Sequence, residues 1–226
     1  MADEAAGLPS PKKENARIRV FVDYWNFQLS LNRVEDGALH TINEARFKVD
    51  WRALGPWLTK KAAEIIRPPA SYSFEGMNIY TSYNPQTAEG RGFKKWATTW
   101  LDRQPGIQVE CRERKPRALP KCPVCHREIR NCPYDGCGKS IVATIEKGVD
   151  TLIATDMIRL AWEDAYDIAV LATSDSDLVP AVEFLDVKGL KVVQAGFPPT
   201  GVDLATKCWA SFDVGASRSE IARHEK

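Results

Sequence analysis

The stretch "AVLATSDSDLVPAVEFL", from Ala169 to Leu185, decides how the fold of this chain is interpreted. An apolar run typical of a buried strand leads into Asp175 and Asp177, and an apolar run with helical spacing follows. We therefore predict a strand at residues 167–173 and a helix at residues 177–189. A buried strand, a polar turn and a helix in this order are typical of α/β proteins.

The alternation of strands and helices continues on both sides of this stretch. Near-continuous apolar runs typical of strands occur at residues 17–23, 77–83, 106–114 and 190–196. Helices are predicted at residues 49–66, 86–102 and 146–165, and a short helix with an edge strand at 201–214. Residues 24–31, "YWNFQLSL", fit either a loop or the start of a helix. The pattern predicts an α/β fold with helices on both faces of a mainly parallel sheet.

Length and composition limit the classes of protein to consider. The chain has 226 residues and is 44% hydrophobic, which suffices for one large domain or a domain with an inserted module. Its 31 basic and 30 acidic residues nearly cancel, so nucleic-acid binding would require a local basic patch. The N-terminal sequence does not resemble a signal peptide, and no segment approaches the roughly 18 apolar residues of a membrane span. We expect a cytoplasmic protein with no membrane partner and with reduced cysteines.

Carboxylates occur at the ends of several predicted elements. Asp23 ends the first predicted strand, and Asp175 follows the strand of the opening stretch. Because the carboxyl ends of parallel strands share one edge of a sheet, we expect these two side chains near one another. Asp150 heads an apolar face of the long helix predicted at 146–165, and Asp177 follows Asp175 by two residues. The four acids are candidates for one site.

Converging carboxylates repel one another, so a cation is expected between them. Hard carboxylate oxygens favour Mg²⁺ or Mn²⁺ over Zn²⁺. Such ions lower the pKa of a bound water and stabilise the attacking and leaving oxygens of a phosphodiester. The sequence therefore predicts metal-assisted hydrolysis. Lys147 is a candidate to neutralise phosphate, and Asn26 either orients Asp23, contacts the substrate or caps the next helix.

Helix capping is the alternative explanation for the acidic pair. Ser174 and Asp177 fit the S-x-x-D relative of the capping box. Pro180 is tolerated only in the first turn of a helix, so the helix is expected to start no earlier than Ser176. Asp175 is then expected on the loop, facing the crevice. Asp177 is expected to cap the helix as well as to bind metal.

Three of these motifs together resemble the NYN domain family of PIN-like ribonucleases. They are "VFVDYWNF", "EKGVDTLIATDMIRLA" and "LATSDSDLVPAVEFL", and the resemblance covers residues 17–214. It implies a PIN-like three-layer α/β/α sandwich that binds Mg²⁺ or Mn²⁺ and cleaves RNA, usually single-stranded. Position by position, it implies a catalytic set made of the first-strand metal ligand, its asparagine partner and the later acids: Asp23, Asn26, Asp150, Asp175 and Asp177.

A cysteine-rich insert interrupts the predicted sheet. "CPVCHREIRNCPYDGC" is a C-x₂-C-x₆-C-x₄-C array formed by Cys122, Cys125, Cys132 and Cys137. Four thiolates are a ligand set that structural Zn²⁺ prefers, and they leave no open position for catalysis. The alternative is a set of reduced or disulfide-paired thiols. Cys111 and Cys208 lie outside the array and are expected to be ordinary buried or partly buried thiols.

The insert and its flanks also supply the local basic patch that the net charge does not provide. The candidates for RNA contact are Arg112, Arg114, Lys115, Arg117, Arg127 and Arg130, in addition to Lys147. A zinc-folded basic arm beside an acidic crevice would be able to follow a phosphate backbone. The alternative is a solvated or partner-binding surface.

These observations predict four segments and a leading function. The segments are a flexible arm at 1–16, an NYN (PIN-like) nuclease domain at 17–214, a zinc-binding insert at 115–142 within it, and a C-terminal tail at 215–226. The leading hypothesis is a metal-dependent endoribonuclease with single-stranded RNA as its partner. The alternative is a non-catalytic RNA-binding or regulatory module. A phosphatase of the haloacid dehalogenase type would need an acid two residues after Asp23, where this chain has Trp25.

Overall fold

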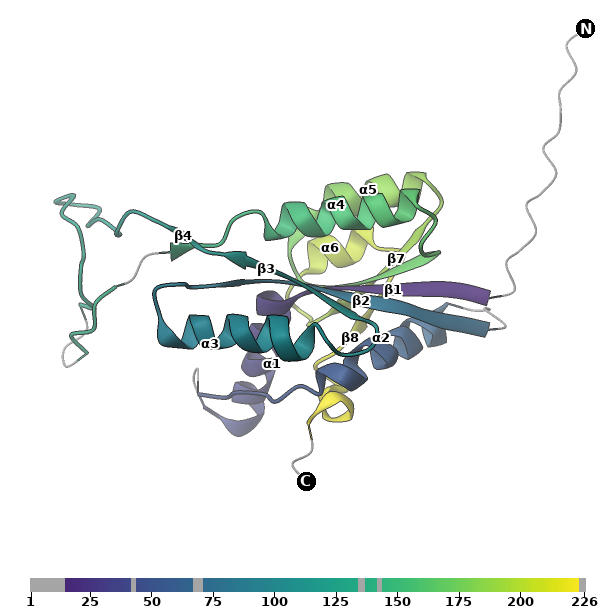
Figure 1. The fold of residues 1–226 in the computed structure, drawn as a ribbon, viewed down its shortest axis with the longest axis horizontal. Coiled ribbons are helices and arrows are strands. Elements are labelled where there is room, and N and C mark those ends of the chain that lie inside the picture. Colours follow the sequence, from purple (N-terminus) through teal and green to yellow (C-terminus); the bar gives the residue numbers. More distant parts are fainter. Residues whose placement is uncertain (1–14, 42–43, 67–70, 134–136, 142–143, 224–226) are drawn as a thin grey trace, which may run out of the picture.

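In the computed structural model, six strands lie side by side in one parallel sheet (Figure 1). The structure describes residues 15–41, 44–66, 71–133, 137–141 and 144–223. The strands are β1 (Asn15–Asp23), β2 (Ser71–Tyr83), β3 (Ile107–Glu113), β6 (Ile168–Ala172), β7 (Lys191–Gly196) and β8 (Ala210–Asp213). Their order is β3-β2-β1-β6-β7-β8, and every neighbouring pair is parallel. The predicted α/β fold with a parallel sheet is confirmed.

Helices cover both faces of the sheet and make the molecule a three-layer α/β/α sandwich. One face carries α1 (Tyr24–Leu39), α2 (Trp51–Ile65) and α3 (Ala88–Trp96), which continues as a π-helical turn, η1 (Ala97–Leu101). The other face carries α4 (Val149–Trp162), α5 (Val179–Val187) and α6 (Val202–Lys207) (Figure 1). Among the described residues, none of the helices combines the length and apolar character that a membrane crossing requires.

Each face of the sheet has its own hydrophobic core. In β1, Ile18, Val20 and Val22 belong to the core beneath α1 and α2, whereas Phe21 belongs to the core beneath α4 and α5. All four side chains are completely buried. Successive strand residues point to opposite faces, so a strand buried on both sides must be apolar without interruption. This is why the strands were recognisable as continuous apolar runs.

The order of the strands reverses between β1 and β6. The chain places β2 and β3 on one side of β1, and after α4 it places β6, β7 and β8 on the other side. At such a reversal the connections leave the carboxyl ends of the two central strands in opposite directions and open a crevice between them. Asp23 is the last residue of β1, and Asp175 follows the end of β6 by three residues. The topology therefore brings both acids to the same crevice.

The ambiguous stretch 24–31 is the first half of α1. The side chain of Asp23 begins this helix by accepting a hydrogen bond from the backbone N–H of Asn26 at 3.2 Å. Tyr24, Phe27 and Leu31 then pack in the core at helical spacing. Leu29, on the opposite side, is 46% exposed, and this apolar residue on the outer face obscured the helical period in the sequence.

The insert leaves the sandwich on a short two-stranded neck. β4 (Lys115–Pro116) pairs antiparallel with β5 (Thr144–Ile145), and the described residues between them project away from the body of the molecule (Figure 1).

The domain starts earlier than predicted. Asn15 and Ala16, which were assigned to the flexible arm, pair with β2 as the first residues of β1; the rest of that arm, residues 1–14, lies outside the described residues.

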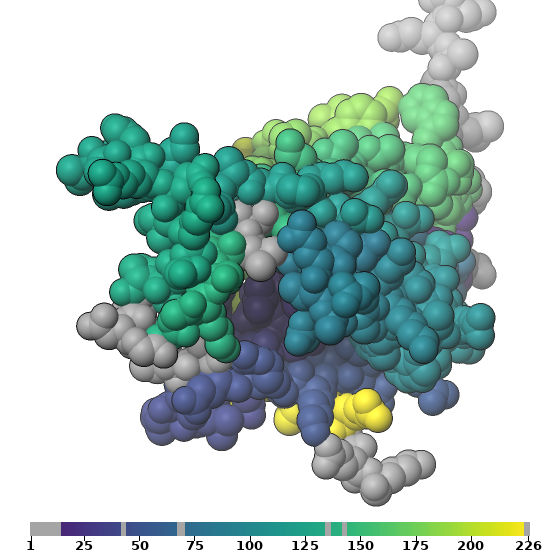
Figure 2. Space-filling view, turned by 60° about the vertical axis from the view of Figure 1, so that its left-hand side comes forward, coloured from purple at the N-terminus to yellow at the C-terminus, as the bar shows by residue number. Residues whose placement is uncertain are grey.

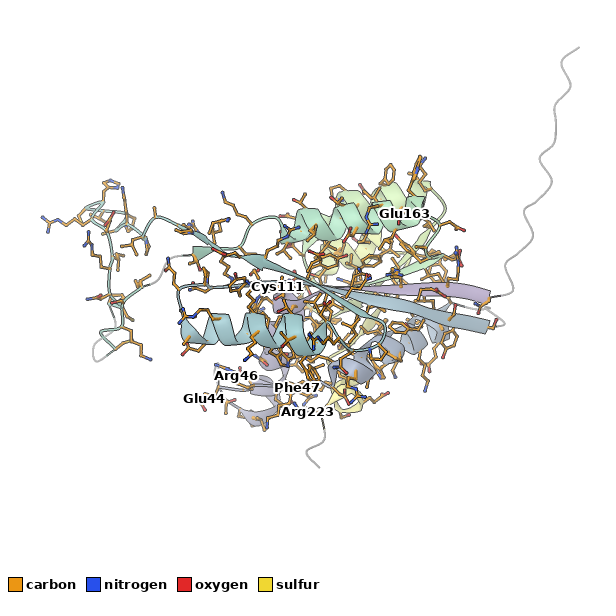
Figure 3. The ribbon with its side chains drawn as sticks, viewed as in Figure 1. Glu44, Arg46, Phe47, Cys111, Glu163 and Arg223 are labelled. Atoms are coloured by element: carbon orange, nitrogen blue, oxygen red, sulfur yellow. The ribbon has the colours of Figure 1, made fainter. Side chains whose placement is uncertain are left out.

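The predicted C-terminal tail is part of the folded domain as far as Arg223. A short 3₁₀ helix, η3 (Arg218–Ile221), packs against the core beneath α2, and Ile221 is completely buried. The backbone N–H of Arg223 donates to the carbonyl of Lys48 at 2.8 Å, and Figure 3 shows Arg223 close to Phe47. The assignment of 215–226 as a tail is therefore wrong up to this residue.

Candidate metal centre

Asp150, Asp175 and Asp177 lie together at the crevice. One carboxylate oxygen from each lies within 4.8 Å of the other two, and no other set of three His, Cys, Asp or Glu side chains among the described residues is so placed. Asp150 is in the first turn of α4, and Asp175 and Asp177 flank the start of a 3₁₀ turn, η2 (Ser176–Leu178), that leads into α5. Because Asp177 is exposed, a ligand reaches the set from solvent.

Asp23 is buried beside this set and shares its electrostatic field. It is only 5% exposed. Burial raises the pKa of Asp23 to about 7; the hydrogen bond from Asn26 opposes this rise, and the charges of Glu146, Asp150 and Asp175 add to it. Burial, followed by the neighbouring carboxylates, likewise raises the pKa of Asp150. Negative charge is therefore concentrated here, and this favours the binding of a metal ion.

Asp175 and Asp177 have the opposite capping roles from those predicted. Asp175 precedes η2 and accepts a hydrogen bond from the backbone N–H of Asp177 at 2.9 Å, whereas Asp177 lies inside the first turn. An aspartate bonds readily to the backbone two residues on, and this short turn replaces the expected capping box of Ser174. The expected helix start, no earlier than Ser176, is confirmed. Asp175 therefore shapes the turn and also contributes to the carboxylate set.

Asn26 connects the ends of the two central strands. Its side-chain Oδ1 accepts a hydrogen bond from the backbone N–H of Ser174 at 2.9 Å. Its backbone N–H contacts Asp23, so the carboxamide itself holds the loop after β6. The hydroxyl of Ser174 is buried and has no hydrogen-bond partner among the described residues. Asn26 thus positions the loop that carries Asp175.

Glu146 is a further acid at this site that sequence reasoning missed. It precedes α4, and its carboxylate accepts a hydrogen bond from the buried hydroxyl of Ser82 near the end of β2. Arg114 Nε donates to the same hydroxyl oxygen at 2.8 Å, and Arg114 Nη2 lies 3.8 Å from Glu146 Oε2. Glu146 lies four residues before Asp150 and outside α4, so only its contacts with Ser82 and Arg114 identify it as a residue of the site.

A buried glutamine supports the other side of the crevice and was also missed. Gln194 in β7 is 2% exposed, and its Nε2 donates to the carbonyls of Thr173 at 3.0 Å and Gly201 at 3.3 Å. It thereby ties the loop after β6 to the start of α6. An uncharged polar residue in the middle of a predicted strand whose other polar residue, Lys191, is near its start was the signal that would have identified it.

The basic residues predicted to contact RNA fall into separate places. A groove of about 640 Å³ beside the start of α4 is lined by four basic residues: Lys94, Arg112, Lys115 and Lys147. Arg114 instead lies beside Glu146, and its guanidinium lies 5.4 Å from the centre of the Trp25 ring. Arg114 follows Glu113, the last residue of β3, and its hydrogen bond to Ser82 sets the direction of its side chain.

The remaining basic candidates are on the insert. Arg117, Arg127 and Arg130 are exposed, and Arg130 pairs with Glu128 at 3.3 Å. Figure 2 shows the insert standing out from the body, with a hollow between it and the side of the molecule that carries α3. Purple residues, from the part of the chain that contains α1, are visible at the bottom of this hollow. The insert therefore borders an open approach to the body of the domain.

The loop after β7 packs closely against Ser174 at Gly201. Its φ is +78°, and a Cβ there would lie 2.7 Å from Ser174 Cβ and 2.8 Å from Ser174 Cα. We expect Gly201→Ala to lower the free energy of unfolding by about 2 to 4 kcal/mol, because backbone strain and overpacking add. Gly189→Ala is the matched control, with φ +80° and open space around it, and should cost only about 1 kcal/mol. Urea unfolding measures both; equal losses would contradict the prediction.

Comparison with known protein families gives a match that covers most of the chain. The family model for the NYN domain matches residues 17–211, which include every acid of the candidate centre. A search of curated proteins found no match. Among solved structures, the crystal structure of a protein of unknown function from Vibrio parahaemolyticus is similar, with 17% identity and a TM-score of 0.48 over 90% of this chain and 97% of that chain. The family match spans most of the sandwich, and the chain belongs to the NYN domain family.

Proposed function

We propose that this protein is a metal-dependent endoribonuclease that hydrolyses phosphodiester bonds of single-stranded RNA, using Mg²⁺ or Mn²⁺. The observation that carries the proposal is the set formed by Asp150, Asp175 and Asp177, whose ligand oxygens lie within 4.8 Å of one another at the crevice. NYN domains are nuclease-like, so the family supports the same reaction class. The nature of the substrate and of the metal rests on the chemistry of the residues around this set.

The donor atoms of the set fit a hard divalent cation. All three are carboxylate oxygens, the ligands that Mg²⁺ and Mn²⁺ prefer, and the set contains no thiol or imidazole to favour Zn²⁺. The raised pKa of Asp23 adds a physical reason, because a cation near this buried acid would favour its charged form. A divalent ion bound there supplies water activation and stabilises charge that develops on phosphate.

The residues around the set position the loop that carries Asp175 or are available to contact the RNA backbone. Asn26 and Gln194 hold the loop that carries Asp175 in place, as their hydrogen bonds to that loop indicate. Arg114 is held beside Glu146 by its hydrogen bond to Ser82, and its guanidinium is a candidate to contact a phosphate of the substrate. The groove of four basic residues beside the start of α4 extends the positive surface along which a backbone would lie.

Exposed aromatic side chains favour single-stranded RNA as the substrate. Trp96 and Trp100 stack with their ring centres 5.9 Å apart, and Trp100 is 41% exposed. They line a cavity of about 1110 Å³ whose wall also includes the basic residues Lys48, Arg52 and Arg223. Exposed aromatic rings next to basic groups suit unpaired bases, whose faces are free to stack, and they do not suit a closed duplex.

We expect the purified protein with Mn²⁺ or Mg²⁺ to shorten a single-stranded RNA, and EDTA to prevent this. A duplex of the same sequence should be cleaved more slowly, because its bases are not free to stack. The measurement is denaturing gel electrophoresis of labelled RNA, with single-stranded DNA of the same sequence as a further control. RNA that is bound but remains intact with every divalent metal would contradict the proposal and favour a non-catalytic binding module.

A further inference from the structure

The insert carries a second cluster of metal-ligating side chains, away from the carboxylates. We propose that Cys122, Cys125, Cys132 and Cys137 bind one Zn²⁺ ion through four thiolates and that this ion holds the insert together. The proposal does not depend on the nuclease activity, because none of these residues belongs to the carboxylate set. It assigns a structural metal to a segment that the rest of the fold leaves without support.

The four cysteines lie in two loops with the same construction. Each loop is closed by an antiparallel bridge. In each case the residue before the first cysteine pairs with a residue beyond the second cysteine: Lys121 with Glu128, and Asn131 with Ser140. The N–H of Cys122 donates to the carbonyl of Arg127, and the N–H of Cys132 donates to that of Lys139, both at 2.9 Å. In each case the acceptor is the residue just before the bridge partner. Two equivalent loops, each with a cysteine pair, present two equivalent halves of a tetrahedral site.

The first loop brings its two cysteines together beside backbone N–H groups. The backbone N–H groups of Val124 and Cys125 and the Cys125 thiol lie near the Cys122 sulfur. Backbone N–H groups directed at one sulfur stabilise negative charge on it, and the thiolate, not the thiol, is the metal ligand. The side chains of the pair are therefore turned toward a common point.

The insert has no apolar interior of its own. None of its described residues from Lys115 to Ile141 is buried, and Val124 is 86% exposed. Exposed backbone hydrogen bonds contribute little net free energy, so two small loops without a core need another source of stability. A structural zinc ion supplies it, because its binding free energy becomes folding free energy.

Metal binding must also bring the two loops together. All four cysteines are described and all are free thiols, and no three of their sulfur atoms lie within 4.8 Å of one another. Ligand sets of this kind are commonly assembled by the ion itself. We therefore expect zinc to make the insert more compact and to leave the sandwich unchanged, since none of the described residues of the insert belongs to either hydrophobic core.

The chain offers its own controls for the test. Cys111 lies on β3 within the body of the molecule, away from the insert (Figure 3), and burial raises the pKa of the Cys208 thiol to about 12. We expect elemental analysis to find about one zinc per chain in the wild type, in Cys111→Ser and in Cys208→Ser. Cys122→Ser and Cys132→Ser, one from each loop, should lose most of it. Asp175→Asn should retain it, which separates this proposal from the nuclease proposal.

A second measurement keeps the proposal testable if the serine variants fold poorly. Replacing the zinc of the wild type by Co²⁺ should give the absorption bands of a tetrahedral cobalt thiolate, and chelation should abolish them and make the insert sensitive to protease. Three results would overturn the proposal: absence of zinc with all four thiols of the insert reactive in the folded protein, retention of zinc in Cys122→Ser, or iron in place of zinc.

Discussion

Asp175→Asn is expected to reduce the rate of RNA cleavage by about 100-fold or more and to leave the fold intact. The carboxylate of Asp175 has a structural and a chemical task. It accepts a hydrogen bond from the N–H of Asp177, and it contributes an oxygen to the carboxylate set. Asparagine retains an oxygen for the first task and loses the charge needed for the second, and loss of one preorganised electrostatic group costs about 10²- to 10³-fold in rate.

The control for this variant is an aspartate on the neighbouring helix. Asp186 is exposed on α5 and does not belong to the carboxylate set, so Asp186→Asn should cleave RNA at the wild-type rate. Single-turnover rates with Mn²⁺ measure the effect, and the midpoint of thermal unfolding in EDTA confirms that both variants are folded. If Asp175→Asn cleaved RNA as fast as Asp186→Asn, the carboxylate set would not be the catalytic centre.

The sheet and its strand-end acids could be predicted because strong physical constraints act on short stretches of sequence. A strand buried on both faces has to be apolar throughout, so β1 and β6 were visible as continuous runs, and Asp23 and Asp175 marked their ends. The final turn of the domain was not visible in this way. Ile221 is one apolar residue among polar ones, and its burial depends on α2, more than 150 residues earlier in the chain.

The parts of the site that were missed depend on contacts between distant segments. Glu146 is recognisable as a site residue only once Ser82 and Arg114 are placed beside it by β2 and β3. The predicted capping roles of Asp175 and Asp177 were wrong because two capping geometries fit the same sequence. The choice between them depends on whether the loop after β6 is already held by other groups, and here Asn26 holds it.

In the absence of divalent metal, raising the pH from 5 to 8 is expected to destabilise the protein, and Asp23 is the main reason. Its pKa is 3.8 as an ordinary aspartate and about 7 in the folded protein. Between these values the folded state binds the proton and the unfolded state does not, so stability falls as the pH rises through this window and the loss is complete above pH 7. The raised pKa of Asp150 acts in the same direction.

The free energy of unfolding is expected to fall by about 3 kcal/mol between pH 5 and 8. About two pKa units of the shift of Asp23 lie above pH 5, and each unit corresponds to about 1.4 kcal/mol. For a domain of this size it corresponds to a fall in melting temperature on the order of 10 °C. Thermal unfolding in EDTA at several pH values measures it. Mn²⁺ should restore much of the loss at pH 8 in the wild type, since a cation favours the charged form of Asp23 and its neighbours.

Asp23→Asn isolates the contribution of this residue. Asparagine is still able to accept the hydrogen bond from the N–H of Asn26 that begins α1, so the helix start is retained, but the side chain no longer ionises. The metal-free variant should therefore be more stable than the wild type at pH 8, and its melting temperature should depend less on pH, whereas Asp186→Asn should behave as the wild type. If Asp23→Asn lost as much stability as the wild type between pH 5 and 8, the buried charge at the end of β1 would not be the cause.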